Sequence, residues 1–109
     1  MREKNILING LRIHYKMAGE GQPILILHGW GGSSDSWIKV QEILAKKGYK
    51  VIIPDFPGFG KSITPREPWG IDDYTGFIFN FIKKTKLKNF FLLGHSFGGR
   101  VSVRFASLY

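Results

Sequence analysis

The chain has 109 residues, of which 43% are hydrophobic and 22% charged; its net charge is +8 and it contains no cysteine. This length allows one domain, and the composition excludes a disordered chain. Disulfides and thiol catalysis are excluded as well. The first apolar run, residues 6–8, is far shorter than a signal-peptide core, and no run approaches membrane-spanning length. We therefore expect a cytoplasmic protein that has no membrane partner.

The positive charge is unevenly distributed along the chain. Residues 1–73 carry ten basic and eight acidic side chains, whereas residues 74–109 carry six basic side chains and no acidic one. Four of those six lie in KKTKLK, residues 83–88, at the end of a predicted helix, where cations offset the helix dipole. Because no recognition motif accompanies this run, it predicts a solvated helix end, and we expect no nucleic-acid partner.

The first third of the chain predicts three strands. Residues 5–8 and 11–17 alternate in the manner of strands, and the Asn9-Gly10 pair between them favours a type I′ hairpin turn. Residues 23–27 (PILIL) form a wholly apolar run, which is typical of a strand covered on both faces.

The middle of the chain predicts a helix, a strand and a loop. Residues 35–47 place Trp37, Val40 and Leu44 on one helical stripe, with Ser34 or Asp35 available as the cap and Gly48 as the stop. A second buried strand is expected in YKVIIPDF, residues 49–56, before a loop rich in proline and glycine over residues 57–70.

The last third predicts another helix, strand and helix. Apolar side chains recur at helical spacing from Tyr74 to Ile82, and two aspartates, Asp72 and Asp73, lie at the start of that helix. NFFLLG, residues 89–94, indicates a third buried strand, and we expect VSVRF after it to be helical. Such alternation predicts an α/β fold: a mostly parallel sheet with an N-terminal antiparallel hairpin and helices on both faces. Ligands in such sheets bind at the carboxyl ends of the strands.

Ser96 is the candidate nucleophile. It lies in the frame Gly94-His95-Ser96-Phe97-Gly98, directly after the third buried strand. A G-x-S-x-G pattern works where a strand turns sharply into a helix, so that the serine is strained and exposed. Gly94 and Gly98 must then be small, because the helix and the strand cross closely. The alternative is an ordinary strand-to-helix turn.

A glycine-rich loop supplies a candidate oxyanion hole. His28-Gly29-Trp30-Gly31-Gly32 follows the strand PILIL, and such a loop lets backbone N–H groups approach a substrate. We expect the amides of Trp30 and Phe97 to be the donors, with Gly31 as the reserve for Trp30. The alternative is a flexible loop without this role.

Three ordered motifs carry a resemblance to a known family. HGWGG after PILIL, DFPGFGKS after YKVIIP and GHSFGG after NFFLL are similar to the N-terminal half of an α/β-hydrolase-fold enzyme. The resemblance covers nearly the whole chain and implies a serine hydrolase that acts on a small-molecule ester, lactone, amide or related carbonyl compound, without cofactor or metal. The serine departs from the dehalogenase and epoxide-hydrolase branches, whose nucleophile is aspartate. A carboxylesterase, lactonase or carbon–carbon bond hydrolase fits better.

The same resemblance places the catalytic acid and histidine after the nucleophile, and residues 97–109 contain no histidine, aspartate or glutamate. The histidines and the aspartate that precede or adjoin Ser96 are unsuited to act as the catalytic base or acid. We expect His14 to be exposed on the hairpin, His28 to pack beneath the site, and His95 to point away from its neighbour Ser96. Asp55 is interpreted as part of a turn.

We accordingly expect residues 1–109 to be the N-terminal part of a single α/β-hydrolase domain, inactive alone, whose last strand leaves an exposed edge. Two alternatives stay open: one half of a split or assembled enzyme, or a non-catalytic binding module that keeps the turn for packing. The Lys61-Ser62 pair in the second glycine-rich loop lacks the G-x-x-x-x-G-K-[ST] spacing of a phosphate loop.

Overall fold

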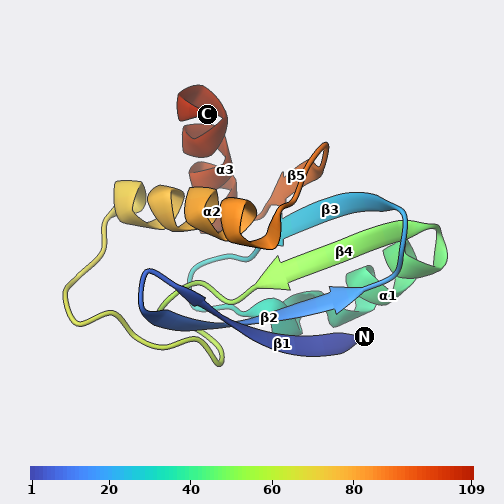
Figure 1. Cartoon of the computed structure of the whole chain (residues 1–109), viewed down its shortest axis with the longest axis horizontal. Helices are drawn as coiled ribbons and strands as arrows, with labels where there is room; N and C mark the ends of the chain where they lie inside the picture. The colour runs from blue at the N-terminus through green and yellow to red at the C-terminus, as the bar shows by residue number, and fades with distance from the viewer.

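The computed structural model describes all 109 residues, in one five-stranded sheet with helices on both faces (Figure 1). The elements in chain order are β1 (Arg2–Ile8), β2 (Leu11–Ala18), β3 (Gln22–Leu27), the short 3-10 helix η1 (Ser34–Trp37), α1 (Ile38–Lys46), β4 (Tyr49–Pro54), α2 (Ile71–Thr85), β5 (Phe91–Gly94) and α3 (Phe97–Leu108). The α/β fold expected from the sequence is thereby confirmed. None of the helices combines the length and the hydrophobicity that a membrane-spanning segment requires.

The sheet has the strand order β1-β2-β4-β3-β5. β3 pairs in parallel with both β4 and β5, whereas β1 and β2 form an antiparallel hairpin whose second strand pairs antiparallel with β4. Asn9 and Gly10, with φ of 48° and 80°, make the predicted tight turn. The carboxyl ends of β3, β4 and β5 therefore lie together at one end of the sheet, where all three sequence motifs begin.

The central strands are apolar throughout because each of their faces is covered. In β3, Leu25 and Leu27 belong to the larger core beneath α2 and α3, while Ile24 and Ile26 belong to a second core shared with residues of η1 and α1. Figure 1 shows α1 on one side of the sheet and α2 and α3 on the other. Alternate side chains of a single strand thus hold two helical layers against the sheet.

The helix predicted over residues 35–47 differs from the observed one in its start and its buried face. Ser33, rather than Ser34 or Asp35, caps η1 through its side chain, and α1 begins only at Ile38. Trp37 and Leu44 pack on the core as predicted, but Val40 is exposed and Gln41 is fully buried. Gln41 Nε2 donates to the Val51 carbonyl at 3.1 Å, whereas its Oε1 is buried without a hydrogen-bond partner.

The helix predicted from Tyr74 to Ile82 extends in both directions, over Ile71–Thr85. The Gly70 amide donates to the Asp73 carboxylate at 2.8 Å, so this aspartate satisfies a free donor at the positive end of α2. Lys83 and Lys84 lie in its last turn, as the KKTKLK run predicted. Helix α3 starts at Phe97, directly after Ser96.

β5 lies at one edge of the sheet. It pairs with β3 on one side and with nothing on the other, and the side chains of Phe91 and Leu93 are 59% and 37% exposed. This arrangement matches the exposed edge that we expected from the sequence, and it places the turn that carries Ser96 at the end of the least supported strand.

Candidate active site

Ser96 occupies a sharp turn between β5 and α3 in an unusual backbone conformation. Its φ is 56° and its ψ is −115°, values that residues other than glycine rarely adopt. Strain of this kind costs on the order of 1–3 kcal/mol and persists only where the surrounding structure enforces it. The residue is exposed, and its hydroxyl forms no hydrogen bond with another protein group. The turn therefore presents a free hydroxyl at the strand-end edge of the sheet.

Two glycines make this turn possible. A Cβ on Gly94 would overlap the Gly98 carbonyl and the Ser102 hydroxyl, and one on Gly98 would overlap the carbonyl oxygens of Leu27 and His28. Helix α3 thus crosses β5 and the end of β3 at backbone contact distance. This is the close crossing for which we expected glycine two residues before and two residues after the serine.

The loop after β3 lies against the same turn. A Cβ on Gly29 would come within 3.4 Å of the Ser96 Cβ, and the Gly32 amide donates to the Gly29 carbonyl at 3.0 Å to close the loop on itself. Gly31 has a φ of 78°, which favours glycine there. The amides of Trp30 and Phe97 donate to no acceptor within the protein. Both are therefore free to bind an external oxygen atom.

The Trp30 side chain stands over this loop in a group of aromatic rings. It is 63% exposed, and its ring lies 4.7 Å from that of Phe59, 5.1 Å from that of Phe97 and 6.2 Å from that of Tyr74, in edge-to-face contacts. Edge-to-face pairs of this kind stabilise by about 0.5–1.5 kcal/mol each beyond the area that they bury. The group forms an aromatic cluster around the Trp30 side chain that the sequence motifs did not reveal.

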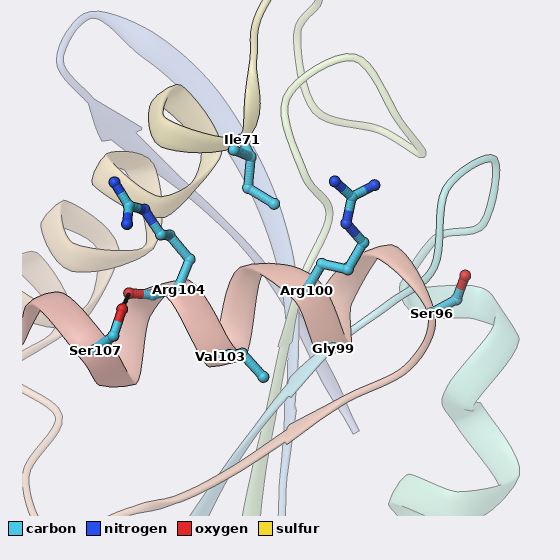
Figure 2. A pocket seen from close by; sticks show the side chains of 7 residues that line it. All are labelled: Ile71, Ser96, Gly99, Arg100, Val103, Arg104 and Ser107. Atoms are coloured by element: carbon cyan, nitrogen blue, oxygen red, sulfur yellow. Dashed lines mark hydrogen bonds between the residues drawn. The ribbon is translucent and has the colours of Figure 1, made fainter.

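A broad open depression of about 750 Å³ begins at Ser96 and runs along α3 (Figure 2). It is lined by residues from α3 and by the first residue of α2: Ile71, Ser96, Gly99, Arg100, Val103, Arg104 and Ser107. Its volume is in the range of small-molecule sites. Neither arginine was singled out in the sequence as a site residue, because nothing in the local pattern distinguishes them from solvated helix residues.

His95 is directed away from the serine depression. Its ring lies 5.8 Å from that of Trp37, and it lines a separate depression of about 280 Å³ with Gly29, Trp30 and others that do not include Ser96. This agrees with the expectation that adjacent residues 95 and 96 face different ways.

His28 is fully buried beneath the loop. Its Nε2 accepts the Phe56 amide at 3.0 Å, and its Nδ1 lies 2.8 Å from the Gly29 carbonyl, to which it can donate. These two partners fit a neutral ring protonated on Nδ1. Burial lowers the pKa of His28 below 6.5, although the Gly29 carbonyl and the Asp55 charge oppose that change. His28 thus ties the start of the loop to the end of β4.

The expectation that His14 is exposed was wrong. Only 3% of the residue is exposed, because the residues after β3 and β4 fold over that face of β2. Its Nδ1 lies 2.8 Å from Asp55 Oδ2 and its Nε2 lies 2.9 Å from Glu3 Oε1. The neighbouring Lys16 is buried as well, with its Nζ 2.7 Å from Asp35 Oδ1. The polar face of β2 therefore carries two buried side chains, His14 and Lys16, that pair with acidic residues of β1, η1 and the segment after β4.

Asp55 lies at the centre of this network, in contact with both glycine-rich loops. Its carboxylate accepts the amides of Ser34 at 2.7 Å and Lys61 at 3.0 Å, in addition to the contact with His14. Burial alone would raise the pKa of this carboxyl group, but the hydrogen bonds from Lys61, Ser34 and His14 outweigh it and hold the pKa below 3.8. Asp55 therefore has a structural role. The Lys61-Ser62 pair has one as well, because the Lys61 amide and the Ser62 hydroxyl both donate hydrogen bonds to Asp55.

Comparison with known proteins agrees with this geometry. The sequence profile of the alpha/beta hydrolase fold family matches residues 22–109. The chain is 34% identical over 100 residues to a soluble epoxide hydrolase of Corynebacterium sp., which covers 92% of this chain and 35% of that protein. It is 33% identical over 99 residues to a non-heme haloperoxidase of Rhodococcus erythropolis, which covers 91% of this chain and 36% of that protein.

Solved structures give the same result. A bromoperoxidase from Bacillus anthracis superposes with a TM-score of 0.92 at 34% identity, over 99% of this chain and 40% of the other. An epoxide hydrolase from Vigna radiata superposes with a TM-score of 0.92 at 27% identity, over 97% of this chain and 34% of the other. The chain spans about a third of the length of these relatives. It belongs to the α/β-hydrolase-fold family.

Proposed function

We propose that this chain carries the nucleophile and the oxyanion hole of a serine hydrolase that acts on an ester, a lactone or a related carbonyl compound. The observation that carries the proposal is the strained, exposed turn that presents a free Ser96 hydroxyl close to a loop with an unused amide at Trp30. The second unused amide, that of Phe97, directly follows the serine, as expected at the first position of a helix.

In the proposed reaction, Ser96 Oγ forms a bond to the carbonyl carbon and loses its proton to a base. The carbonyl oxygen takes up the negative charge and is stabilised by the Trp30 and Phe97 amides. The bond to the leaving group then breaks as that group receives a proton, and water hydrolyses the resulting acyl-serine ester.

The identity of residue 96 supports a carbonyl substrate over an epoxide. A serine hydroxyl that opened an epoxide would form an ether, which water does not cleave under mild conditions, whereas an acyl-serine is an ester and hydrolyses. For this reason we do not propose an epoxide as the substrate of this chain, although some of its relatives are named as epoxide hydrolases. An ester and an epoxide with the same carbon skeleton, offered in parallel, distinguish the two.

The base and its acidic partner lie outside these 109 residues, either further along the same polypeptide or in a second chain. This part of the proposal rests on the three histidines, since His14 and His28 are buried and His95 lines another depression. The chain of 109 residues is expected to show negligible turnover of p-nitrophenyl acetate. A normal esterase rate from these residues would contradict the proposal.

The decisive test is a polypeptide or complex that contains residues 1–109 together with the missing base and acid. Ser96→Ala in that protein should reduce kcat/KM by about 10³-fold or more. An acyl adduct on Ser96, detected by mass spectrometry after rapid quenching, should disappear with it. Full retention of function in Ser96→Ala would instead favour a non-catalytic module in which the turn serves packing.

A further inference from the structure

The depression that begins at Ser96 has two arginines and no acidic residue among the side chains that line it. We propose that the carbonyl substrate carries a carboxylate, and that Arg100 holds this carboxylate while Ser96 attacks the carbonyl group. The inference rests on the proposed function of Ser96, but its test does not, because binding of the anion requires no reaction.

Arg100 lies one helical turn after the serine. The Arg100 amide donates to the Ser96 carbonyl at 3.1 Å, so the two residues occupy the same side of the first turn of α3. Figure 2 shows the Ser96 hydroxyl and the Arg100 side chain projecting from that side of the helix. The Arg100 guanidinium forms no salt bridge and no side-chain hydrogen bond within the protein. Its donors are therefore available to a ligand.

Arg104 lies one helical turn after Arg100, and the two form a row of arginines on α3. Unlike Arg100, it already forms an ion pair within the protein. Its Nε lies 2.9 Å from Asp72 Oδ1, between two exposed side chains. This ion pair occupies Asp72, and no acidic side chain of these residues pairs with Arg100. The charge of Arg100 is thus not neutralised locally, and the depression attracts anions.

The remaining lining fits a short acyl chain. Ile71 and Val103 contribute the apolar part of the lining, and Figure 2 shows the Ile71 side chain between those of Arg100 and Arg104. A guanidinium binds a carboxylate through two parallel hydrogen bonds, which fixes the orientation of the ligand as well as its charge. A dicarboxylic acid monoester combines these features, since one end is a carboxylate and the other an ester.

The test uses two probes that differ only at one end, monomethyl succinate and methyl butyrate. Each is titrated into ¹⁵N-labelled protein while the amide signals of residues 96–104 are followed by NMR. Monomethyl succinate should shift these signals saturably and bind about tenfold more tightly than methyl butyrate, as one charge-assisted contact predicts. Added salt should weaken its binding.

The variant Arg100→Gln should abolish the preference for the anion, and Arg12→Gln, on the hairpin, is the matched control that should retain it. Equal binding of the two probes, or an unchanged preference in Arg100→Gln, would overturn the inference. If the preference is present but no acyl adduct forms on Ser96 in the complete protein, the proposed function fails and the anion site stands. If acyl adducts form equally from anionic and neutral esters, the proposed function stands and the proposed role of Arg100 in binding the substrate fails.

Discussion

His14 and Asp55 are separated by 41 positions in the sequence, yet Nδ1 of His14 lies 2.8 Å from Oδ2 of Asp55, and both side chains are buried. The contact joins β2 to the residue that follows β4. Through its other bonds Asp55 reaches Ser34, after the glycine-rich loop of residues 28–32, while the next residue, Phe56, reaches His28 at the start of that loop. Two consecutive residues thus hold both ends of the loop that carries Trp30.

Replacement of this carboxylate is expected to be costly. Asp55→Asn leaves the buried network without its charge and should lower the free energy of unfolding by about 3 kcal/mol. Asp72→Asn, which removes an exposed partner of Arg104, should cost less than about 1 kcal/mol. Urea denaturation of both variants measures the difference. Equal losses would show that the network contributes no more than a surface ion pair.

Stability should decline as the solution is acidified through the ordinary histidine range. The pKa of His28 lies below 6.5 in the folded protein because the ring is buried, so below pH 6.5 the unfolded state binds a proton that the folded state does not. The contribution is complete above pH 6.5 and is lost below it, at a slope of at most about 1.4 kcal/mol per pH unit for this one group. Urea midpoints measured between pH 5 and pH 8 give this slope.

His28→Gln isolates the effect. Glutamine can accept the Phe56 amide hydrogen bond but does not titrate, so the slope between pH 6.5 and pH 5 should become smaller in this variant. If the wild-type slope persists unchanged, another group is responsible for it.

The crossing of β5 and α3 predicts opposite effects for two glycine substitutions. Gly98→Ala places a methyl group against the backbone of Leu27 and His28, neither of which can move freely, and should cost about 3 kcal/mol or prevent folding. Gly76→Ala, within α2 at a position with open space around it, should stabilise by up to about 1 kcal/mol. Thermal denaturation followed by circular dichroism compares them, and a neutral Gly98→Ala would refute the close crossing.

The strain at Ser96 predicts a difference between two variants that both lack the hydroxyl. Ser96→Ala retains a Cβ at a positive φ, whereas Ser96→Gly removes it. The glycine variant should therefore be more stable than the alanine variant by about 1 kcal/mol, despite the greater flexibility of glycine in the unfolded state. The reverse order in chemical denaturation would mean that the turn is not strained.

The sequence predicted the order of the elements well, because the apolar runs PILIL and YKVIIP and the Asn9-Gly10 turn are local signals. It failed at His14, whose alternation with Ile13 and Tyr15 indicated a solvated strand face. That face is buried by segments that follow β3 and β4. A local sequence pattern cannot predict burial by segments that are distant in the sequence. The sequence does show charged residues of opposite sign on β1, β2 and the two loops, which could have indicated a network of ion pairs. Which of them pair, however, depends on the fold.

The edge position of β5 determines how firmly the proposed nucleophile is held. The Ser96 turn is anchored by one ladder only, which ends with the His95 amide bonded to the Leu27 carbonyl at 3.1 Å. Local opening of β5 breaks bonds to a single neighbour, whereas opening of β3 or β4 breaks bonds to two. Amide hydrogens of residues 91–95 should accordingly exchange with solvent sooner than those of β3. Any segment that pairs with the free edge would slow this exchange and make the geometry of the serine more persistent.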